Sequence, residues 1–273
     1  MMKEVIFWMI VLLSETEKDC SCEMELENGA EQKADKTDSE GTCVEQEPKQ
    51  CCKSPCSTVS FSSAQTMALV PYNEESLPIL FKPERQFTFL GHTLTIRQDW
   101  GNHGVAAVVW DAAIVLGEYL EKHQDIVRNR HVLELGAGTG LVGIVAALAG
   151  GEVTCTERAE TLDHLRATVS SNLNGHRLEV KELDWTHDHS YLNSDYDVIL
   201  GADIVYIEDT FPDLLRTLLH FAGPDTKVLL SCKIRYQRDS KFLTMLKEHF
   251  HISKVHFDLE RDIYIYAAKK TER

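Results

Sequence analysis

The sequence predicts an α/β fold whose sheet is mainly parallel and ends in an antiparallel hairpin. Strand-like apolar runs alternate with helix-compatible segments from residue 131 to residue 250. Such alternation is typical of a parallel sheet that is covered by helices on both faces. Two further strand-like runs follow with no helix between them, and strands joined in this way pair antiparallel. The hydrophobic fraction of 43% and the charged fraction of 26% agree with a globular domain.

The alternation divides into seven expected strands and four expected helices. The strands are expected at 131–135, 152–156, 178–183, 196–201, 227–232, 251–257 and 262–268, and the helices at 141–149, 160–173, 211–221 and 240–250. Ahead of them, two short alternating runs within residues 86–96 flank Gly91 and His92 and predict a β-hairpin. Residues 105–120 are apolar and helix-compatible, and we expect a helix there.

Residues 1–66 differ in composition from the rest of the chain. They hold 13 acidic and 6 basic residues and six of the eight cysteines. Few large apolar side chains are present to offset the entropy of ordering, so we expect a disordered acidic extension ahead of a domain at 67–273. The apolar run Val5–Leu13 is shorter than the ~20 residues of a spanning helix. It leaves a signal peptide open, although no small-residue cleavage site follows. Met67 is a second possible start of translation.

Charge and cysteine placement limit the partners and the compartment. The formal net charge of −15, with no cluster of lysine and arginine, argues against nucleic acid as a partner. Cys155 and Cys232 lie within apolar strand-like runs and are interpreted as buried free thiols of a reduced, intracellular domain. We therefore expect a monomer that is cytoplasmic, or nuclear as well, without membrane association.

The first expected strand runs into a glycine-rich turn, Glu134-Leu135-Gly136-Ala137-Gly138-Thr139-Gly140. Glycines allow a tight turn with positive φ and a close approach of ligand to backbone. Glu157 ends the next expected strand, 21 residues after Gly136, where a carboxylate can accept both hydrogen bonds of a ribose diol. The pattern predicts a nucleoside cofactor. Residues 138–143 also match G-x-G-x-x-G formally, so a dinucleotide stays open.

Three segments together resemble one enzyme family. The turn at 134–140 resembles the first motif of seven-strand, Rossmann-like methyltransferases. Val109-Trp110-Asp111 and Asp203-Ile204-Val205-Tyr206 are similar to motifs of the non-histone protein-lysine N-methyltransferases that carry D-x-x-Y. Residues 67–273 are similar throughout to the member of that family that methylates chaperones of the heat shock protein 70 class. The resemblance leaves residues 1–66 without an explanation.

The resemblance implies a cofactor, S-adenosyl-L-methionine, and a set of residues that contact it. These are Trp110, Gly136, Ala137, Gly138, Glu157, Trp185 and Ala202. The two tryptophans offer flat faces to the nucleoside and the sulfonium. The family member in question carries aspartate at the position of Glu157, and glutamate, one methylene longer, still reaches the diol. Asp203 and Tyr206 are expected to be catalytic: Asp203 orients the amine or the cofactor's amino group, and Tyr206 lines the lysine channel. The alternative for Asp203 is a cap of a helix at 208–221.

The implied function is transfer of methyl groups to a lysine of a protein, with a heat shock protein 70 class chaperone as the implied partner. A methyltransferase of nucleic acids or small molecules is one alternative, although Ile204-Val205 stands where base amino-methylases carry two prolines. A nicotinamide-dependent oxidoreductase and a non-enzymatic chaperone scaffold are others. We expect no metal site, and we interpret His187-Asp188-His189 as a solvated loop.

Overall fold

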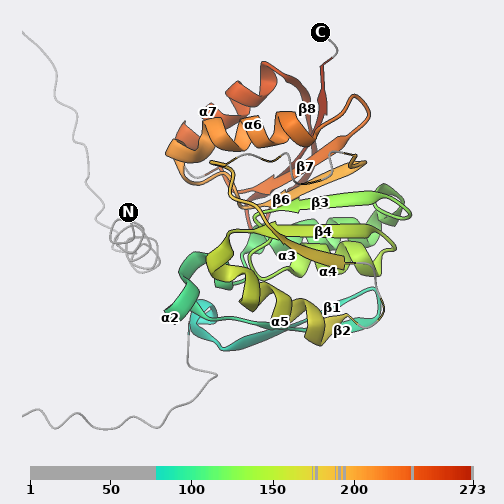
Figure 1. Ribbon diagram of the computed structural model, residues 1–273, viewed down its shortest axis with the longest axis vertical. Helices are drawn as coiled ribbons and strands as arrows, with labels where there is room; N and C mark the ends of the chain where they lie inside the picture. Colours follow the sequence, from blue (N-terminus) through green and yellow to red (C-terminus); the bar gives the residue numbers. More distant parts are fainter. Residues whose placement is uncertain are drawn as a thin grey trace, which may run out of the picture. The chain divides into compact units, whose positions relative to one another are not determined.

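The computed structural model describes residues 78–173, 175, 178–187, 189, 192, 195–234 and 237–271. In these ranges a seven-stranded sheet forms the central layer, in the order β5-β4-β3-β6-β7-β9-β8 (Figure 1). The strands are β3 (His131–Leu135), β4 (Glu152–Glu157), β5 (Leu178–Glu182), β6 (Val198–Ala202), β7 (Lys227–Cys232), β8 (Phe250–Asp258) and β9 (Ile263–Lys270). β9 pairs antiparallel with β7 and β8, and the other neighbours pair parallel. The predicted fold class and terminal hairpin are confirmed.

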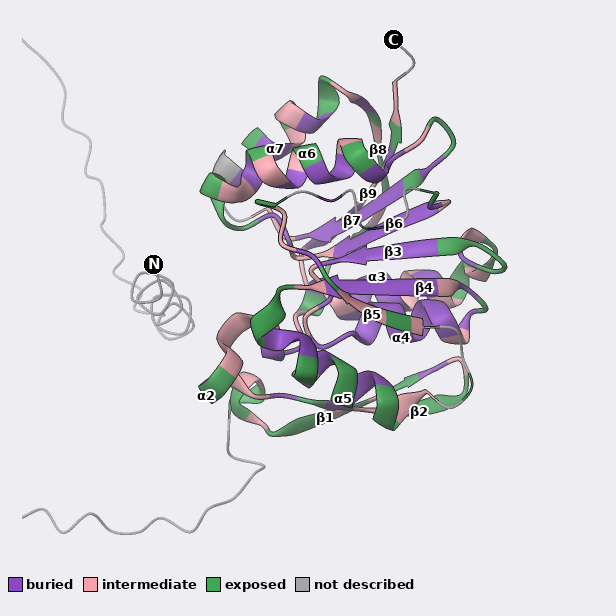
Figure 2. Cartoon of the chain, viewed as in Figure 1, coloured by how far each residue is buried: buried purple, intermediate pink, exposed green. Residues whose placement is uncertain are grey.

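Two groups of helices cover opposite faces of the sheet. One face packs against α3 (Asp111–Lys122), α4 (Leu141–Leu148) and α5 (Leu162–Asn172), and the other against α6 (Phe211–Phe221) and α7 (Gln237–Lys247). Three short 3₁₀ turns join these elements, η4 (Gln124–Ile126), η5 (Ala159–Thr161) and η6 (Glu208–Thr210), and a further one, η2 (Ile79–Phe81), lies ahead of the first strand. The central strands are buried on both sides (Figure 2), as expected for parallel strands between two helical layers.

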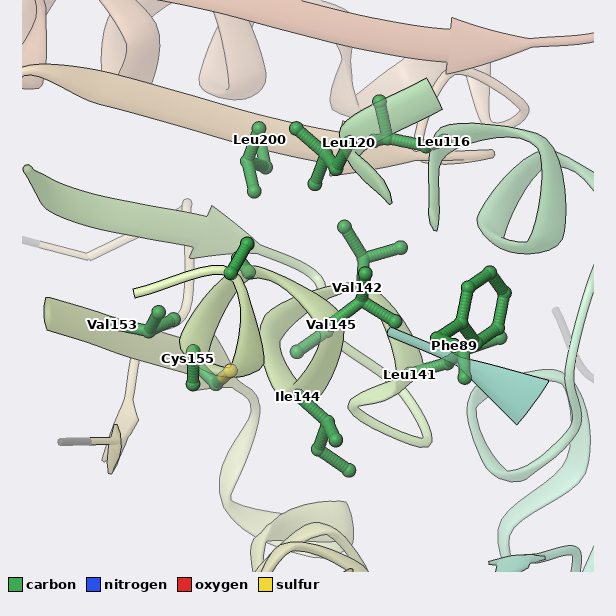
Figure 3. Packing of buried hydrophobic residues seen from close by; sticks show 14 of the residues in the cluster. Phe89, Leu116, Leu120, Leu141, Val142, Ile144, Val145, Val153, Cys155 and Leu200 are labelled. Carbon is green, nitrogen blue, oxygen red and sulfur yellow. The ribbon is translucent and has the colours of Figure 1, made fainter. Parts of the chain in front are cut away.

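The predicted N-terminal hairpin is confirmed as a separate two-stranded sheet of β1 (Glu84–Phe89) and β2 (His92–Arg97). Leu90 and Gly91 both have positive φ, as a two-residue hairpin turn requires. Phe89 is buried in the same cluster as residues of α3 and α4 (Figure 3), where a Cβ on Gly117 would lie 3.1 Å from its ring. Asn172 of α5 bonds both backbone groups of Thr95, accepting from its N–H at 2.8 Å and donating to its carbonyl at 2.9 Å. The hairpin is thus fixed to the helical layer from two sides.

The helix expected over residues 105–120 is wrong in its first part. A short helix α2 (Trp100–His103) and a 3₁₀ turn η3 (Gly104–Ala107) precede an extended stretch, and α3 begins only at Asp111. Gly104 ends α2 with φ of 59° and ψ of −136°. Both backbone groups of Val109 bond to side chains of the hairpin rather than to helical neighbours. Tertiary hydrogen bonds therefore override the apolar pattern here.

The predicted N-terminal extension lies outside the residues that the structure describes. Residues 1–66 are outside the described residues, so the expected disordered extension and the start at Met67 stay predictions. In the described ranges no single helix has the length and apolar character of a membrane span. The bent pair Trp100–Ala107 and Asp111–Lys122 meets the test on length and composition alone. Most of the apolar residues of α3 are buried in the core, which accounts for that composition.

Candidate active site

The glycine corner, residues 136–140, lies between the end of β3 and the start of α4. Gly136 and Gly138 have φ of 59° and 54°, a conformation that favours glycine. The Ala137 N–H donates to the Thr156 carbonyl at 3.0 Å, which ties the turn to β4. A Cβ on Gly136 would come within 2.9 Å of Ile204 and 3.3 Å of the Trp185 ring. The absent side chain therefore lets Trp185 and Ile204 approach the backbone of the corner.

Glu157 ends β4 beside this corner, as the sequence predicts. Its Oε2 accepts a hydrogen bond from the Gly138 N–H at 2.9 Å, and its Oε1 accepts one from the Arg158 N–H at 3.0 Å. Burial raises the pKa of the carboxyl, and the two backbone donors oppose that rise. Each carboxylate oxygen has a second lone pair, so both can still accept a hydrogen bond from a ligand diol. The geometry fits a carboxylate oriented toward a ribose.

The 104–110 segment, Gly104–Trp110, packs on the same corner. A Cβ on Gly138 would lie 2.9 Å from the carbonyl oxygen of Ala106, so only glycine allows this approach. Trp110 follows in the chain, and its indole Nε1 donates to the Val105 carbonyl at 2.9 Å. The indole is half-buried and is therefore tied to the segment that contacts Gly138. Sequence reasoning identified Trp110 but missed Val105 and Ala106, because no pattern marks two small apolar residues as neighbours of a distant glycine.

The D-x-x-Y segment leaves β6 at the same edge of the sheet. Ala202 ends β6 opposite Ser231 of β7, and the Asp203 N–H donates to the Ser231 carbonyl at 2.8 Å. Asp203 has a positive φ of 53° and caps neither η6 nor α6, whose N-cap residues are Ile207 and Thr210. The alternative interpretation of Asp203 as a helix cap is therefore wrong.

Tyr206 is brought close to both carboxylates of the site. The pKa of its hydroxyl is raised, mainly by partial burial and then by the negative charges of Glu157 and Asp203. The positive charge of Arg158 opposes part of this rise. The side chain is 37% exposed, whereas the two residues before it are at most 4% exposed. The buried pair Ile204-Val205 anchors the segment and leaves Tyr206 at the surface of the site. The sequence-predicted pair Asp203 and Tyr206 thus lies beside the predicted cofactor residues.

Glu134, for which the sequence predicts no role, is an acid buried in β3 just before the corner. Its Oε2 accepts a hydrogen bond from the Cys155 thiol at 3.0 Å. A Cβ on Gly143 of α4 would lie 2.5 Å from that oxygen and 2.1 Å from the sulfur. Burial raises the pKa of Glu134 from 4.5 to about 7. An acidic residue inside an apolar strand was the available signal for it.

The loop after Trp185 differs from its predicted solvated state. His187 is exposed and lies 3.5 Å from an Asp184 oxygen. His189, by contrast, is 4% exposed, and its Nε2 lies 2.9 Å from the Thr217 hydroxyl of α6. The solvated interpretation is therefore wrong for His189, and Asp188 lies outside the described residues. Among the residues that the structure describes, no group of three or more His, Cys, Asp or Glu is placed to hold a metal ion.

Comparison with known sequences identifies the family. A sequence profile described as "Lysine methyltransferase" matches residues 89–249. The chain belongs to the lysine methyltransferase family. The matched residues of this chain include the glycine corner, Glu157 and the D-x-x-Y segment. The predicted enzyme class, a protein-lysine N-methyltransferase, is thereby confirmed, and the alternative of a nicotinamide-dependent oxidoreductase is wrong.

Several individual lysine methyltransferases are similar to this chain over most of their length. The protein N-lysine methyltransferase METTL21A of Mus musculus is 52% identical over 211 residues, covering 75% of this chain and 97% of the relative. METTL21A of Danio rerio is 51% identical, covering 76% and 98%. The EEF1A lysine methyltransferase 3 of Mus musculus is 42% identical, covering 70% and 84%.

A solved structure shares the fold of this lysine methyltransferase at much lower identity. It is the T. thermophilus 16S rRNA N2 G1207 methyltransferase (RsmC) in complex with AdoMet and guanosine. The TM-score is 0.56 at 20% identity, and the match covers 69% of this chain and 50% of that one. At this identity the likeness confirms the Rossmann-like methyltransferase fold and carries no information on substrate.

Proposed function

We propose that the enzyme transfers methyl groups from S-adenosyl-L-methionine to a lysine of a heat shock protein 70 class chaperone. The observation that carries the proposal is the meeting of the glycine corner, Glu157, Asp203 and Tyr206 at one edge of the sheet. Open α/β sheets bind their ligands at this carboxyl edge. The family membership supplies the reaction class, and the METTL21A relatives, together with the sequence resemblance, support the substrate.

The residues of the corner fit the proposed cofactor. Glu157 is oriented by two backbone N–H groups and retains acceptor capacity for a ribose diol. The Trp185 ring lies against Gly136, and Trp110 is tied to the segment above Gly138. Flat aromatic faces suit a nucleoside and a sulfonium cation. When bound, S-adenosyl-L-methionine supplies an activated methyl group, so the chain mainly has to align the acceptor. Ala137 and Ala202 complete the proposed cofactor contacts.

Asp203 and Tyr206 act on the lysine side. A lysine amine must be neutral to attack, and partial burial beside Tyr206 lowers the pKa of an amine by desolvation. The Asp203 carboxylate accepts a hydrogen bond from the amine, or from the amino group of the cofactor, and fixes its direction. Alignment of two reactants can supply several kcal/mol, with ~7–11 kcal/mol as the upper limit for well-oriented pairs. Catalysis in this proposal therefore depends on geometry more than on proton transfer.

The substrate assignment has one direct competitor among the relatives. The relative at 42% identity is named for lysine methylation of EEF1A, whereas those at 51–52% are METTL21A proteins. The higher identity to METTL21A favours an acceptor other than EEF1A, and the chaperone itself is proposed on the sequence resemblance. The chain's net charge of −15 disfavours nucleic acid as an alternative substrate. We further propose that the enzyme works as a monomer in the cytoplasm, or in the nucleus as well.

A labelling experiment tests the proposal. The full chain is incubated with radiolabelled cofactor and, in parallel, with a purified heat shock protein 70, purified EEF1A, total RNA and cell lysate. We expect label in the chaperone and in a lysate band of the same size, lost with Asp203→Ala. Label confined to EEF1A would overturn the substrate, and label in RNA would overturn the class of acceptor.

A further inference from the structure

We propose that the N-terminal hairpin positions the cofactor site, with Gln98 and Arg85 holding Val109 so that Trp110 and the 104–110 segment stay against the glycine corner. The inference rests on the proposed function, because it takes Trp110 as a cofactor contact. It adds two positioning residues, neither of which touches the reacting atoms. Both come from a part of the chain that precedes the seven-stranded sheet.

Gln98 follows β2 and is only 6% exposed. Its Oε1 accepts a hydrogen bond from the Val109 N–H at 2.9 Å. Its Nε2 donates to the carbonyls of Ile79 and Lys82, each at 2.9 Å. The oxygen of the amide thus accepts one hydrogen bond and its NH₂ group donates two, so only one orientation of the amide makes all three hydrogen bonds. A buried amide with three partners is costly to replace, because each partner would be left unpaired.

Arg85 of β1 holds the other backbone group of Val109. Its Nη1 donates to the Val109 carbonyl at 2.9 Å, and the guanidinium lies 4.9 Å from the centre of the Phe87 ring. Burial lowers the pKa of the guanidinium, and the negative charge of neighbouring Asp111 opposes part of this decrease. Val109 therefore has both of its polar backbone groups bonded to hairpin side chains. A third bond, from the Asp99 N–H to the Ala107 carbonyl at 2.9 Å, joins the same two parts of the chain.

Val109 is directly connected to the proposed cofactor site through its neighbours in the chain. Val109 is followed by Trp110, whose indole bonds back to Val105, and Ala106 lies over Gly138. A shift of Val109 therefore moves the Trp110 ring and the Ala106 carbonyl together. The backbone of Trp110 is joined to α3, where its carbonyl accepts a hydrogen bond from the Ala113 N–H at 3.0 Å. The polar backbone groups of Val109 bond to Gln98 and Arg85 instead, so these two side chains restrain the part of the stretch that precedes α3.

The hairpin is fixed to the body of the domain by other contacts, which makes the two roles separable. Phe89 packs in the core beside Gly117, and Asn172 bonds both backbone groups of Thr95. These contacts lie between the hairpin and helices α3 and α5, and they do not involve the 104–110 segment. Removing Asn172 thus weakens the attachment of the hairpin while leaving Val109 bonded, which provides a matched control.

The test compares binding of S-adenosylhomocysteine with stability in the full chain. Calorimetric titration is made with Gln98→Met, Arg85→Met and Asn172→Ala, and the melting temperature of each is measured. We expect the first two variants to raise the Kd about fivefold each, the effect of one lost hydrogen bond to the segment. The KM for the methyl donor should rise while kcat at saturation stays within about twofold. Asn172→Ala should lower the melting temperature and leave the Kd within about twofold.

The outcomes separate this inference from the proposed function. Unchanged Kd values in Gln98→Met and Arg85→Met overturn it, as does an equal rise in Asn172→Ala, which would mean that the hairpin only stabilises the domain. Trp110→Ala is the reference variant: if it binds S-adenosylhomocysteine normally, the proposed site is wrong as well. If it weakens binding and the other two do not, only the positioning role is overturned. Should Gln98→Met fail to fold, Arg85→Met decides, because Arg85 lines an open groove of about 480 Å³ and its truncation leaves no buried void.

Discussion

The glycine corner and the 104–110 segment are both irregular stretches of backbone at the same edge of the sheet, but they are specified differently. The corner is encoded by its own residues, since Gly136, Gly138 and Gly140 permit its positive φ values and its close contacts. The 104–110 segment is apolar and helix-compatible, and side chains more than ten residues from Val109 hold its last part, Val108–Trp110, extended. Local sequence therefore identifies the first as a site, whereas the second becomes visible only in the folded chain.

The comparison also explains which residues serve the site and which serve the fold. Glu157, Asp203 and Tyr206 lie together where motifs placed them. Gln98 and Arg85 carry no motif, Glu134 belongs to the motif at 134–140 without a predicted role, and all three act through the backbone or the core. The two kinds of residue should therefore give different effects on kcat, cofactor affinity and stability when they are changed.

The largest effect on kcat is expected at Asp203, a proposed catalytic side chain that can be changed without altering the backbone. Asp203→Asn keeps the shape of the side chain but removes the charge that orients the acceptor amine, and kcat should fall roughly 300-fold. The affinity for S-adenosylhomocysteine should stay within about threefold. Steady-state kinetics and calorimetry measure both, with the exposed Asp209→Asn of η6 as the control. A variant that keeps wild-type turnover would remove Asp203 from the mechanism.

Glu134 should act on stability alone, and with a defined pH dependence. Its pKa is about 7 in the folded chain and near 4.5 when it is unfolded. The unfolded chain releases this proton first as pH rises, so the group lowers the free energy of unfolding progressively from about pH 4.5 to 7, by up to about 3 kcal/mol.

Urea unfolding at pH 5 and pH 7.5 measures the contribution of Glu134. Glu134→Gln cannot titrate, so the part of the pH dependence that comes from this residue should disappear, whereas Glu248→Gln, at an exposed turn, should retain it. Equal pH dependence in wild type and Glu134→Gln would show that the folded carboxyl has an ordinary pKa.

Gly138→Ala probes the contact between the corner and the 104–110 segment. The alanine must adopt a φ of 54° and places a Cβ 2.9 Å from the Ala106 carbonyl. The strain and the contact together should weaken binding of S-adenosylhomocysteine roughly fiftyfold. Gly91→Ala is the matched control, since its φ is also positive but no atom lies within 4 Å of the new Cβ. It should cost only stability. Equal binding by both variants would refute the contact as part of the site.

The smallest effect is expected at Tyr206. Tyr206→Phe keeps the ring that lines the proposed channel and removes the hydroxyl, so kcat should fall about fivefold with little change in cofactor affinity. Because the pKa of Tyr206 is raised above its ordinary value of 10, the hydroxyl stays protonated below that pH. The pH profile of kcat should therefore have the same shape in both proteins up to pH 9.5. If the pH profile of kcat has a rise or fall in the wild type that is absent in Tyr206→Phe, the hydroxyl of Tyr206 acts as a base.

Much of the fold follows from local patterns. β3, β7 and α6 have the predicted bounds, because each is an uninterrupted apolar or amphipathic run between turn residues. The last helix was expected to reach Phe250, but it ends at Lys247 since Phe250 is buried in β8 opposite Lys270. The extended stretch at Val108–Trp110 could not be predicted, because its partners Arg85 and Gln98 lie 24 and 11 residues from Val109.

The central claim is that one pocket holds the adenosyl group between the glycine corner, Glu157 and the two tryptophans. The most direct measurement is a crystal structure of the full chain with S-adenosylhomocysteine. The account predicts the ribose hydroxyls on the Glu157 carboxylate and the sulfur facing Asp203 and Tyr206. Ligand density at another place, with the corner and Glu157 in contact with solvent alone, would contradict it.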